Sequence, residues 1–194
     1  MNKSWGYNKN NLNYKSTKEL ITYLVRAAGY NANFLLNVGP KPDGTIQPEF
    51  VERLDSIGNW ITSNGGSIYG TRGRPFEPSE KYVTTYKDDK IYVHILDWDG
   101  KNNIGLPAVT DRKVTKAWIL GAAPDVDYSW GFVRQNPWGL RLVVPEDRHN
   151  KPHTIVVLEM EGDVSELKQP RIIDSDPSKE IFLMGDAAKR IGAL

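Results

Sequence analysis

A short apolar run, Asn33 to Val38, is the segment around which the first part of the chain is arranged. It shows no alternation of apolar and polar positions, a pattern typical of a strand buried on both faces of a parallel sheet. Gly39, Pro40, Pro42 and the Asp43–Gly44 pair follow it directly. Because these residues fix φ or permit a positive φ, they end a strand and turn the chain. The pattern therefore predicts a buried strand over 33–38 and then a rigid loop.

Helical periodicity flanks this strand on both sides. Upstream, Ser16 to Glu19 is a capping-box pattern, in which the hydroxyl and carboxylate satisfy backbone amides at a helix start. An apolar stripe follows at Leu20, Ile21, Leu24, Val25 and Ala28, and Gly29 closes it. Downstream, Pro48 suits a first helical turn, and a second stripe passes through Phe50, Val51, Leu54, Ile57 and Ile61 to Asn64–Gly65. This spacing predicts helices over 17–28 and 48–64, so the strand, loop and second helix form one βα unit.

Beyond Gly65 the chain changes to short runs rich in Val, Ile, Tyr and Trp, with turn residues between them. Strands are predicted near residues 82–86, 91–96, 114–120, 132–135, 140–144 and 154–160. Strands at this spacing predict an antiparallel β-sandwich. In the tail, residues 165–179 resemble a charged linker, and Ile181 to Ala187 is expected to open a further domain that is cut short at Leu194.

Three blocks carry a family resemblance: Ser4-Trp5-Gly6-Tyr7, the strand and loop from Asn33 to Ile46, and Ile68-Tyr69-Gly70-Thr71-Arg72. In order and spacing they resemble the last part of the catalytic barrel of the α-L-fucosidases of glycoside hydrolase family 29. The resemblance implies a (β/α)8 barrel whose final strand is 33–38, followed by a small β-sandwich. The expected fold class is therefore α/β plus all-β. Its expected parts are the incomplete end of the barrel over 1–75, the sandwich over 76–164, and a linker with the first strand of a truncated domain over 165–194.

The same resemblance implies a retaining glycosidase that removes terminal α-L-fucose from glycans. Retention needs two carboxyl groups roughly 5 Å apart, one as nucleophile and one as acid and base. The resemblance puts both on barrel strands upstream of the matched residues, and a whole barrel takes roughly 200 residues or more. This chain is therefore expected to be part of a longer or assembled enzyme and inactive alone. Its expected partners are fucosylated glycans, the remainder of the barrel in the same or another chain, and other copies of itself.

Site residues transfer only where the blocks match. Trp5 is the strongest candidate for substrate binding, because an aromatic face can hold the apolar side and methyl group of a deoxy sugar. Tyr7 is a second candidate, and either ring could instead be ordinary packing. Asn37, Gly39 and Asp43 follow a predicted barrel strand, where barrel enzymes build their sites, so we expect them to support or border the pocket. No position corresponds to a catalytic residue.

Leu96-Asp97-Trp98-Asp99-Gly100 invites a false transfer, because it resembles the family's nucleophile segment. Here it follows an alternating strand, so the pattern favours a β-hairpin corner with Asp99–Gly100 as its turn. We expect both aspartates to lie far from Trp5.

An alternative function is a carbohydrate-binding or structural sandwich module, if other tryptophans form an exposed platform: Trp60, Trp98, Trp118, Trp130 and Trp138. Most are expected to be packed in the interior. With 25 basic and 24 acidic residues, the chain has no charge excess to attract nucleic acid or an anionic membrane. Residues His149 and His153 are in a proline-containing loop, which argues against a metal site, and no cofactor is expected. The absence of cysteine leaves the compartment open, a periplasmic or secreted parent enzyme included.

Overall fold

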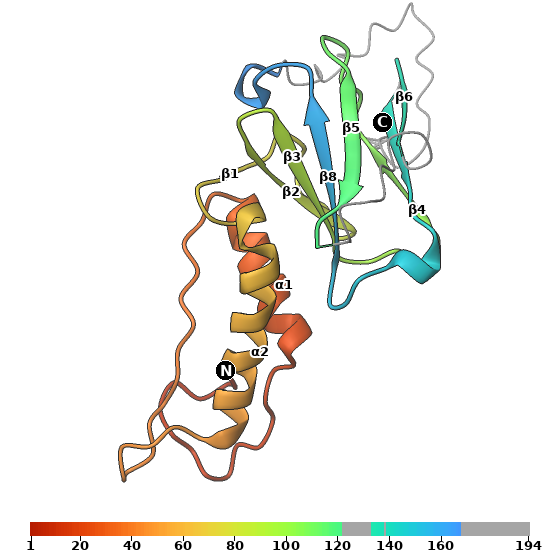
Figure 1. Cartoon of the computed structure of the whole chain (residues 1–194). Helices are drawn as coiled ribbons and strands as arrows, with labels where there is room; N and C mark the ends of the chain where they lie inside the picture. The colour runs from red at the N-terminus through yellow and green to blue at the C-terminus, as the bar shows by residue number, and fades with distance from the viewer. Residues whose placement is uncertain (122–132, 138, 168–194) are drawn as a thin grey trace, which may run out of the picture.

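The computed structural model describes residues 1–121, 133–137 and 139–167, which form a β-sandwich with two helices packed on one of its faces (Figure 1). The first sheet has the strand order β1-β2-β3-β8-β5, and the second has the order β4-β7-β6. Every pairing among these strands is antiparallel. The predicted antiparallel sandwich is confirmed for this part of the chain.

The strands of the first sheet are β1 (Arg72–Gly73), β2 (Tyr82–Lys87), β3 (Lys90–Ile95), β5 (Val114–Ile119) and β8 (Thr154–Met160). The second sheet contains β4 (Asn103–Leu106), β6 (Val133–Asn136) and β7 (Gly139–Val143). Short 3-10 helices cover 65–67, 146–148 and 164–166. The predicted strands coincide with β2, β3, β5, β6, β7 and β8, whereas β1 and β4 were missed because they are short and contain glycine.

Alternation along β3 separates two apolar layers. Ile91, Val93 and Ile95 point into the core between the two sheets, where they meet β4 and β7 residues such as Ile104 and Leu142. Residues 92, 94 and 96 point to the opposite face, toward the helices. The first sheet is therefore buried on both faces.

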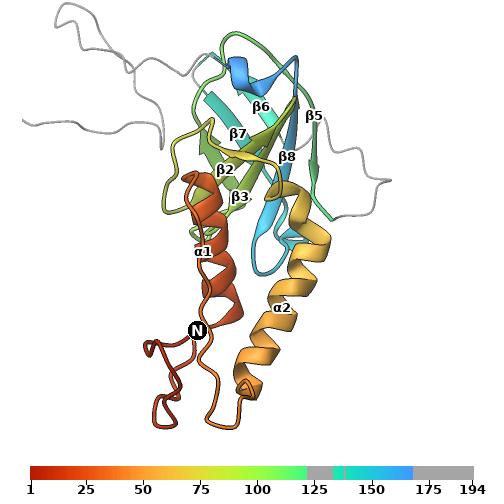
Figure 2. The ribbon, with the colours of Figure 1, turned by 90° about the vertical axis from the view of Figure 1, so that its left-hand side faces the viewer.

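The helices are α1 (Thr17–Gly29) and α2 (Pro48–Asn64), close to the predicted bounds. Both capping-box hydrogen bonds of α1 are present between Ser16 and Glu19, and Pro48 occupies the first turn of α2. The two helices run in the same direction, with their carboxyl ends at the sandwich (Figure 2). Their amino ends lie together, since Gln47 Nε2 donates to the Tyr14 hydroxyl at 3.1 Å.

The helix stripes are buried only in part. Leu20, Ile21 and Val25 of α1 pack in a layer that also contains Val83 and Ile155 of the first sheet. On α2 the buried members are Phe50, Ile57 and Trp60, while Val51 and Leu54 are exposed. The second apolar stripe is therefore only partly covered by the described residues.

The prediction of a strand over 33–38 was also wrong for this chain. These residues have no strand assignment, and they return from the end of α1 toward the start of α2 without joining a sheet (Figure 2). The side chain of Leu35 is 73% exposed, while Phe34, Leu36 and Val38 are half-buried. A strand needs a neighbour to complete its ladder, and no described segment supplies one here.

The Asp97–Gly100 corner differs from the predicted hairpin. Asp99 and Gly100 do form a turn with φ of 52° and 64°, and Lys101 N donates to Trp98 O at 2.9 Å. However, the strands on either side, β3 and β4, belong to different sheets. The segment therefore connects the two layers of the sandwich. Trp130, Trp138 and the expected linker and strand over 168–194 lie outside the described residues. Within the described residues, neither α1 nor α2 is both long enough and apolar enough to cross a membrane.

Candidate functional site

The N-terminal segment and the loop after residue 36 lie against each other at the amino ends of the helices. The amino group of Met1 donates to Asn37 O at 3.0 Å, and Asn37 Nδ2 donates to Trp5 O at 2.5 Å. At Gly39, an added Cβ would lie 2.5 Å from both the Gly6 carbonyl carbon and the Tyr7 nitrogen. The structure thus brings together four predicted site residues, namely Trp5, Tyr7, Asn37 and Gly39.

Asparagine side chains give the N-terminal segment its local shape. Asn2 Oδ1 accepts from Ser4 N at 2.9 Å, and Asn11 Nδ2 donates to Ser4 Oγ at 2.8 Å. Asn2 Nδ2 also donates to Asn11 O at 3.3 Å, which closes a loop around Trp5. Such side-chain bonds to nearby backbone replace regular secondary structure, and this explains the Asn-rich composition of the segment.

A hollow of about 260 Å³ lies beside this contact. Its walls come from the first five residues, from Lys15, Leu20 and Tyr23, and from 34–37. Trp5, at 75% exposure, presents its indole ring to solvent at this place. Lys15 Nζ lies 5.7 Å from the centre of the Tyr23 ring. Lys15 and Tyr23 were missed from the sequence, because both lie off the apolar stripe that drew attention to this helix.

The hollow carries aromatic and cationic groups but no carboxylate. Its charged members are the Met1 amino group, Lys3 and Lys15. Burial, and then the charge of Lys15, lower the pKa of the Met1 amino group. This arrangement can hold the apolar face of a small polar ligand and donate hydrogen bonds to it. It has no pair of carboxyl groups with which to cleave a glycosidic bond.

Asp43 lies on an exposed turn and does not line the hollow. Its Oδ1 accepts from the Thr45 hydroxyl at 2.7 Å and from Thr45 N at 2.9 Å. These hydrogen bonds lower the pKa of the Asp43 carboxyl group. The residue therefore shapes the loop as an ionised turn former, and Gly44, with φ of 81°, completes the turn.

Asp97 and Asp99 have equally local roles. Asp97 Oδ1 accepts from Asp99 N at 2.8 Å, and Asp99 Oδ2 lies 3.5 Å from Lys81 Nζ. Neither aspartate lines the hollow beside Trp5. The two aspartates are exposed residues of the connection between the sheets.

The histidines pack within the protein. The His149 ring stacks on Trp98 with centroids 4.0 Å apart, and its Nε2 lies 2.9 Å from Val144 O. His153 is buried and bonded to Thr22 of α1, while His94 is buried against Thr85. In the described ranges, no three His, Asp or Glu side chains form a group that could hold a metal ion.

Comparison with known proteins gives one consistent result. A family model described as Alpha-L-fucosidase matches residues 1–66. The tissue alpha-L-fucosidase of Bos taurus is 33% identical over 145 residues, which are 73% of this chain and 30% of that protein. That of Rattus norvegicus is 35% identical over 151 residues, 74% of this chain and 31% of that protein. This chain is similar to the α-L-fucosidases.

Solved α-L-fucosidase structures extend the match over the sandwich. Alpha-L-fucosidase isoenzyme 1 from Paenibacillus thiaminolyticus gives a TM-score of 0.71 at 30% identity, covering 82% of this chain and 38% of that one. The Thermotoga maritima alpha-fucosidase in complex with fucose gives 0.67 at 25% identity, covering 81% and 38%. The α-L-fucosidase resemblance inferred from the sequence is thus confirmed. The chain spans about a third of the length of the curated α-L-fucosidases that it matches.

Proposed function

We propose that this chain is part of an α-L-fucosidase that removes terminal α-L-fucose from glycans with retention of configuration. The observation that carries the proposal is the match to the Paenibacillus thiaminolyticus enzyme, because it covers 82% of this chain at 30% identity. A match of that extent includes both the helices and the sandwich. The proposed division is the end of the catalytic barrel over 1–75, the sandwich over 76–164, and a linker with the start of a further domain over 165–194.

Within that enzyme, the contribution of this chain is to substrate binding. The exposed indole of Trp5 offers a flat apolar surface for the methyl group and apolar face of fucose. Tyr7 follows Trp5 closely in the same segment. Asn37 and Gly39 hold this segment through the Trp5 carbonyl and the Gly6–Tyr7 backbone, and Asp43 shapes the adjoining loop. The nucleophile and the acid are proposed to lie on barrel strands that precede the matched residues.

The proposed partner is the remaining barrel, in the same or another chain. Among the described residues, the backbone of 33–38 makes no hydrogen bond to another segment except the Met1 bond to Asn37 O. Leu35 is exposed beside it, and Val51 and Leu54 are exposed on α2. A parallel strand on each side would satisfy this backbone, and neighbouring helices would cover the α2 residues.

The alternative of a separate carbohydrate-binding sandwich has less support. In the described part of the chain, the large apolar side chains that are exposed all precede the sandwich, ending at Tyr69. Trp60 is buried, Trp98 is stacked on His149, and Trp118 is partly buried between the sheet and the helices. These three do not form an aromatic platform.

The test is hydrolysis of an aryl α-L-fucoside. The purified chain alone is expected to release no measurable fucose. Mixed or co-expressed with the part of the Paenibacillus enzyme that this chain does not match, it is expected to restore hydrolysis. Trp5→Ala should then lower kcat/KM by about tenfold or more.

Tyr30→Ala is the matched control, because Tyr30 is also an exposed aromatic residue but lies at the other end of α1. It should leave the restored hydrolysis unchanged. Steady hydrolysis by this chain alone, abolished by Asp43→Asn or Asp97→Asn, would overturn the proposal.

A further inference from the structure

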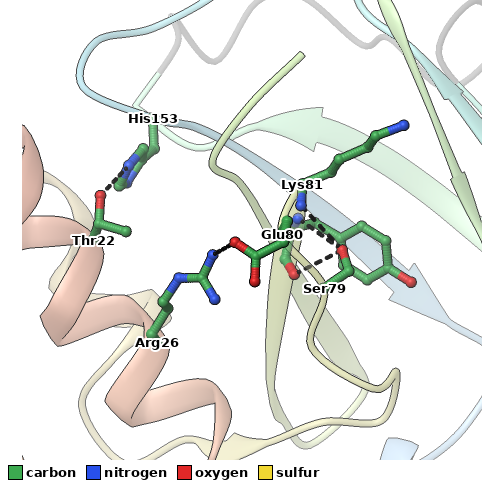
Figure 3. A network of polar contacts seen from close by, with 7 residues as sticks. Thr22, Arg26, Ser79, Glu80, Lys81 and His153 are labelled. Carbon is green, nitrogen blue, oxygen red and sulfur yellow. Dashed lines mark hydrogen bonds and ion pairs between the residues drawn. The ribbon is translucent and has the colours of Figure 1, made fainter. Parts of the chain in front are cut away.

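Two buried histidines lie in the layer where the helices meet the first sheet. His153, in the loop before β8, is 3% exposed, and His94 of β3 is fully buried. Each ring contacts a threonine hydroxyl: His153 Nε2 lies 3.0 Å from Thr22 Oγ1 of α1, and His94 Nε2 lies 3.2 Å from Thr85 Oγ1 of β2. Figure 3 shows the first of these contacts between α1 and the sandwich.

The tautomer of His153 follows from the hydrogen bonds of its partner. The Thr22 hydroxyl donates its single proton to Lys18 O at 2.7 Å. It therefore accepts from the ring, so His153 carries its proton on Nε2. The other ring nitrogen, Nδ1, then carries no proton and can only accept, and it is buried without a hydrogen-bond partner in the part of the chain that the structure describes.

His94 obeys the same logic. The Thr85 hydroxyl donates to Ser67 O at 2.6 Å, directly after α2, so the ring of His94 donates through Nε2 to Thr85 Oγ1. Its Nδ1 is also buried and has no hydrogen-bond partner within residues 1–121, 133–137 and 139–167. Through these two chains of hydrogen bonds, α1 is tied to the loop before β8, and the end of α2 is tied to β2 and β3.

A second proton would lie on Nδ1, which has no hydrogen-bond partner on either ring among the described residues. A hydrogen bond with the Ser67 backbone raises the pKa of His94, but its contribution is smaller than those that lower it. The charged groups around His153 are Lys18 on α1 and Lys151 in its own loop, and the titratable neighbour of His94 is His153 itself. All of these are basic, so protonation would place a cation among cations and apolar side chains. Burial and then the charge of His153 lower the pKa of His94 to about 3, and burial and then Lys18 lower that of His153 to about 4.

The polar contact beside this layer cannot replace the histidine links. Arg26 of α1 lies 2.9 Å from Glu80, as Figure 3 also shows, but the Glu80 side chain is 93% exposed. Exposed ion pairs contribute little to stability. The attachment of the helices therefore depends on the apolar layer, on two histidines that must stay neutral, and on Asn31 after α1, whose Oδ1 accepts from Gly73 N of β1 at 2.7 Å.

We propose that His94 and His153 make an acid-sensitive junction, which releases α1 and α2 from the first sheet as the pH falls below about 6 while the sandwich itself stays folded. Both rings bind a proton more readily once the helices separate, because an exposed histidine has a pKa near 6.5. Stability linked to these groups is therefore complete above about pH 7 and is lost toward their folded-state pKa values. Each histidine raises the opening equilibrium constant roughly 25-fold between pH 7 and pH 5. This device would let pH control where the hollow beside Trp5 sits relative to the sandwich.

The experiment is amide hydrogen exchange of the full untagged chain at pH 7, 6 and 5, corrected for the intrinsic exchange rate. Amides of α1 and α2 are expected to lose protection by at least about 25-fold between pH 7 and pH 5, and those of β3 and β8 to keep theirs. This pH range lies above the one in which carboxyl groups ordinarily titrate, near pH 4, so the titrating groups are the histidines and the Met1 amino group, whose pKa is lowered by burial.

Variants identify the groups. His153→Gln and His94→Gln keep a side-chain N–H for the threonine and cannot titrate, so each should abolish part of the acid sensitivity and the double variant nearly all of it. His149→Gln is the matched control and should leave it intact. If the variants fail to fold, an NMR titration of the histidine ring resonances in the wild-type chain tests the proposal instead. Titration of His94 or His153 near pH 6.5 with the helices still protected would overturn the proposal, as would acid sensitivity that persists in a folded double variant.

Discussion

A side chain at position 39 would have no room, because an added Cβ would meet the backbone of Gly6 and Tyr7 at 2.5 Å. The sequence suggested that Gly39 is a glycine in order to turn the chain, and this reason was wrong. Positive φ occurs instead at Gly44, so Gly39 is needed for the close approach of two backbone segments. The requirement for glycine at position 39 depends on which distant segment packs against it, and a local sequence pattern cannot show that.

Gly39→Ala is therefore expected to separate the N-terminal segment from the loop. Overpacking against backbone should lower the free energy of unfolding by about 1–3 kcal/mol or expel residues 4–7 from their place. Urea unfolding measures the first effect and Trp5 fluorescence the second. Gly6→Ala is the control within the same contact, since no atom of the described residues lies within 4 Å of its added Cβ. Unchanged stability and fluorescence in Gly39→Ala would show that the contact is loose.

Elements whose signals are local were predicted well. The first helix follows from its capping box and stripe, and the second from Pro48 and its periodicity. Strands β3 and β8 follow from dense β-branched and aromatic residues. The segment 33–38 could not be assigned correctly in the same way. A hydrophobic run predicts that its side chains are buried, but it does not show which neighbouring segment covers them. The connection between the sheets at Asp99 could not be predicted either. The sequence pattern of a tight turn is the same whether the two flanking strands pair with each other or belong to different sheets.

The capping box offers a test at this scale. Ser16→Ala removes the side-chain acceptor for Glu19 N, and loss of an N-cap costs about 1 kcal/mol of stability. The expected result is a drop of that size in the free energy of urea unfolding. Glu19→Gln should have a smaller effect, because glutamine can also bond the Ser16 amide that now donates to Glu19 Oε2. Equal losses in the two variants would contradict the reciprocal cap.

At the scale of the whole molecule, exposed apolar residues gather at the side of the helices and their connecting segment. Leu35, Val51 and Leu54 are exposed there, and Trp5 and Leu12 are exposed in the N-terminal segment. Patches of this kind on a described surface mark interaction sites or promote association. From the sequence, self-association was expected because a strand over 33–38 would lack neighbours. That strand is not formed, but the exposed apolar side chains lead to the same expectation of self-association.

We therefore expect the isolated chain to self-associate. Light scattering should give an average mass above 21.9 kDa that rises with concentration. The double variant Leu35→Lys, Leu54→Lys should shift the mass toward the monomer, because it places charge on the apolar surface. Tyr30→Lys, at the sandwich end of α1, should not. A monodisperse wild-type monomer at all concentrations would contradict this expectation.

The double-sided burial of the first sheet bears on how such a chain can be divided or recombined. The sheet residues that face the helices and pack in one apolar layer with them are Val83, Tyr92, Ile155 and Val157. A gene fusion made at residue 75 would expose the apolar face of the first sheet in the fusion protein. It would also remove the sheet surface on which α1 packs. Exchange of modules between relatives is therefore expected to succeed only when the helix pair and the sandwich are transferred together, so a boundary suited to engineering or recombination lies before Ser16 and not at residue 75.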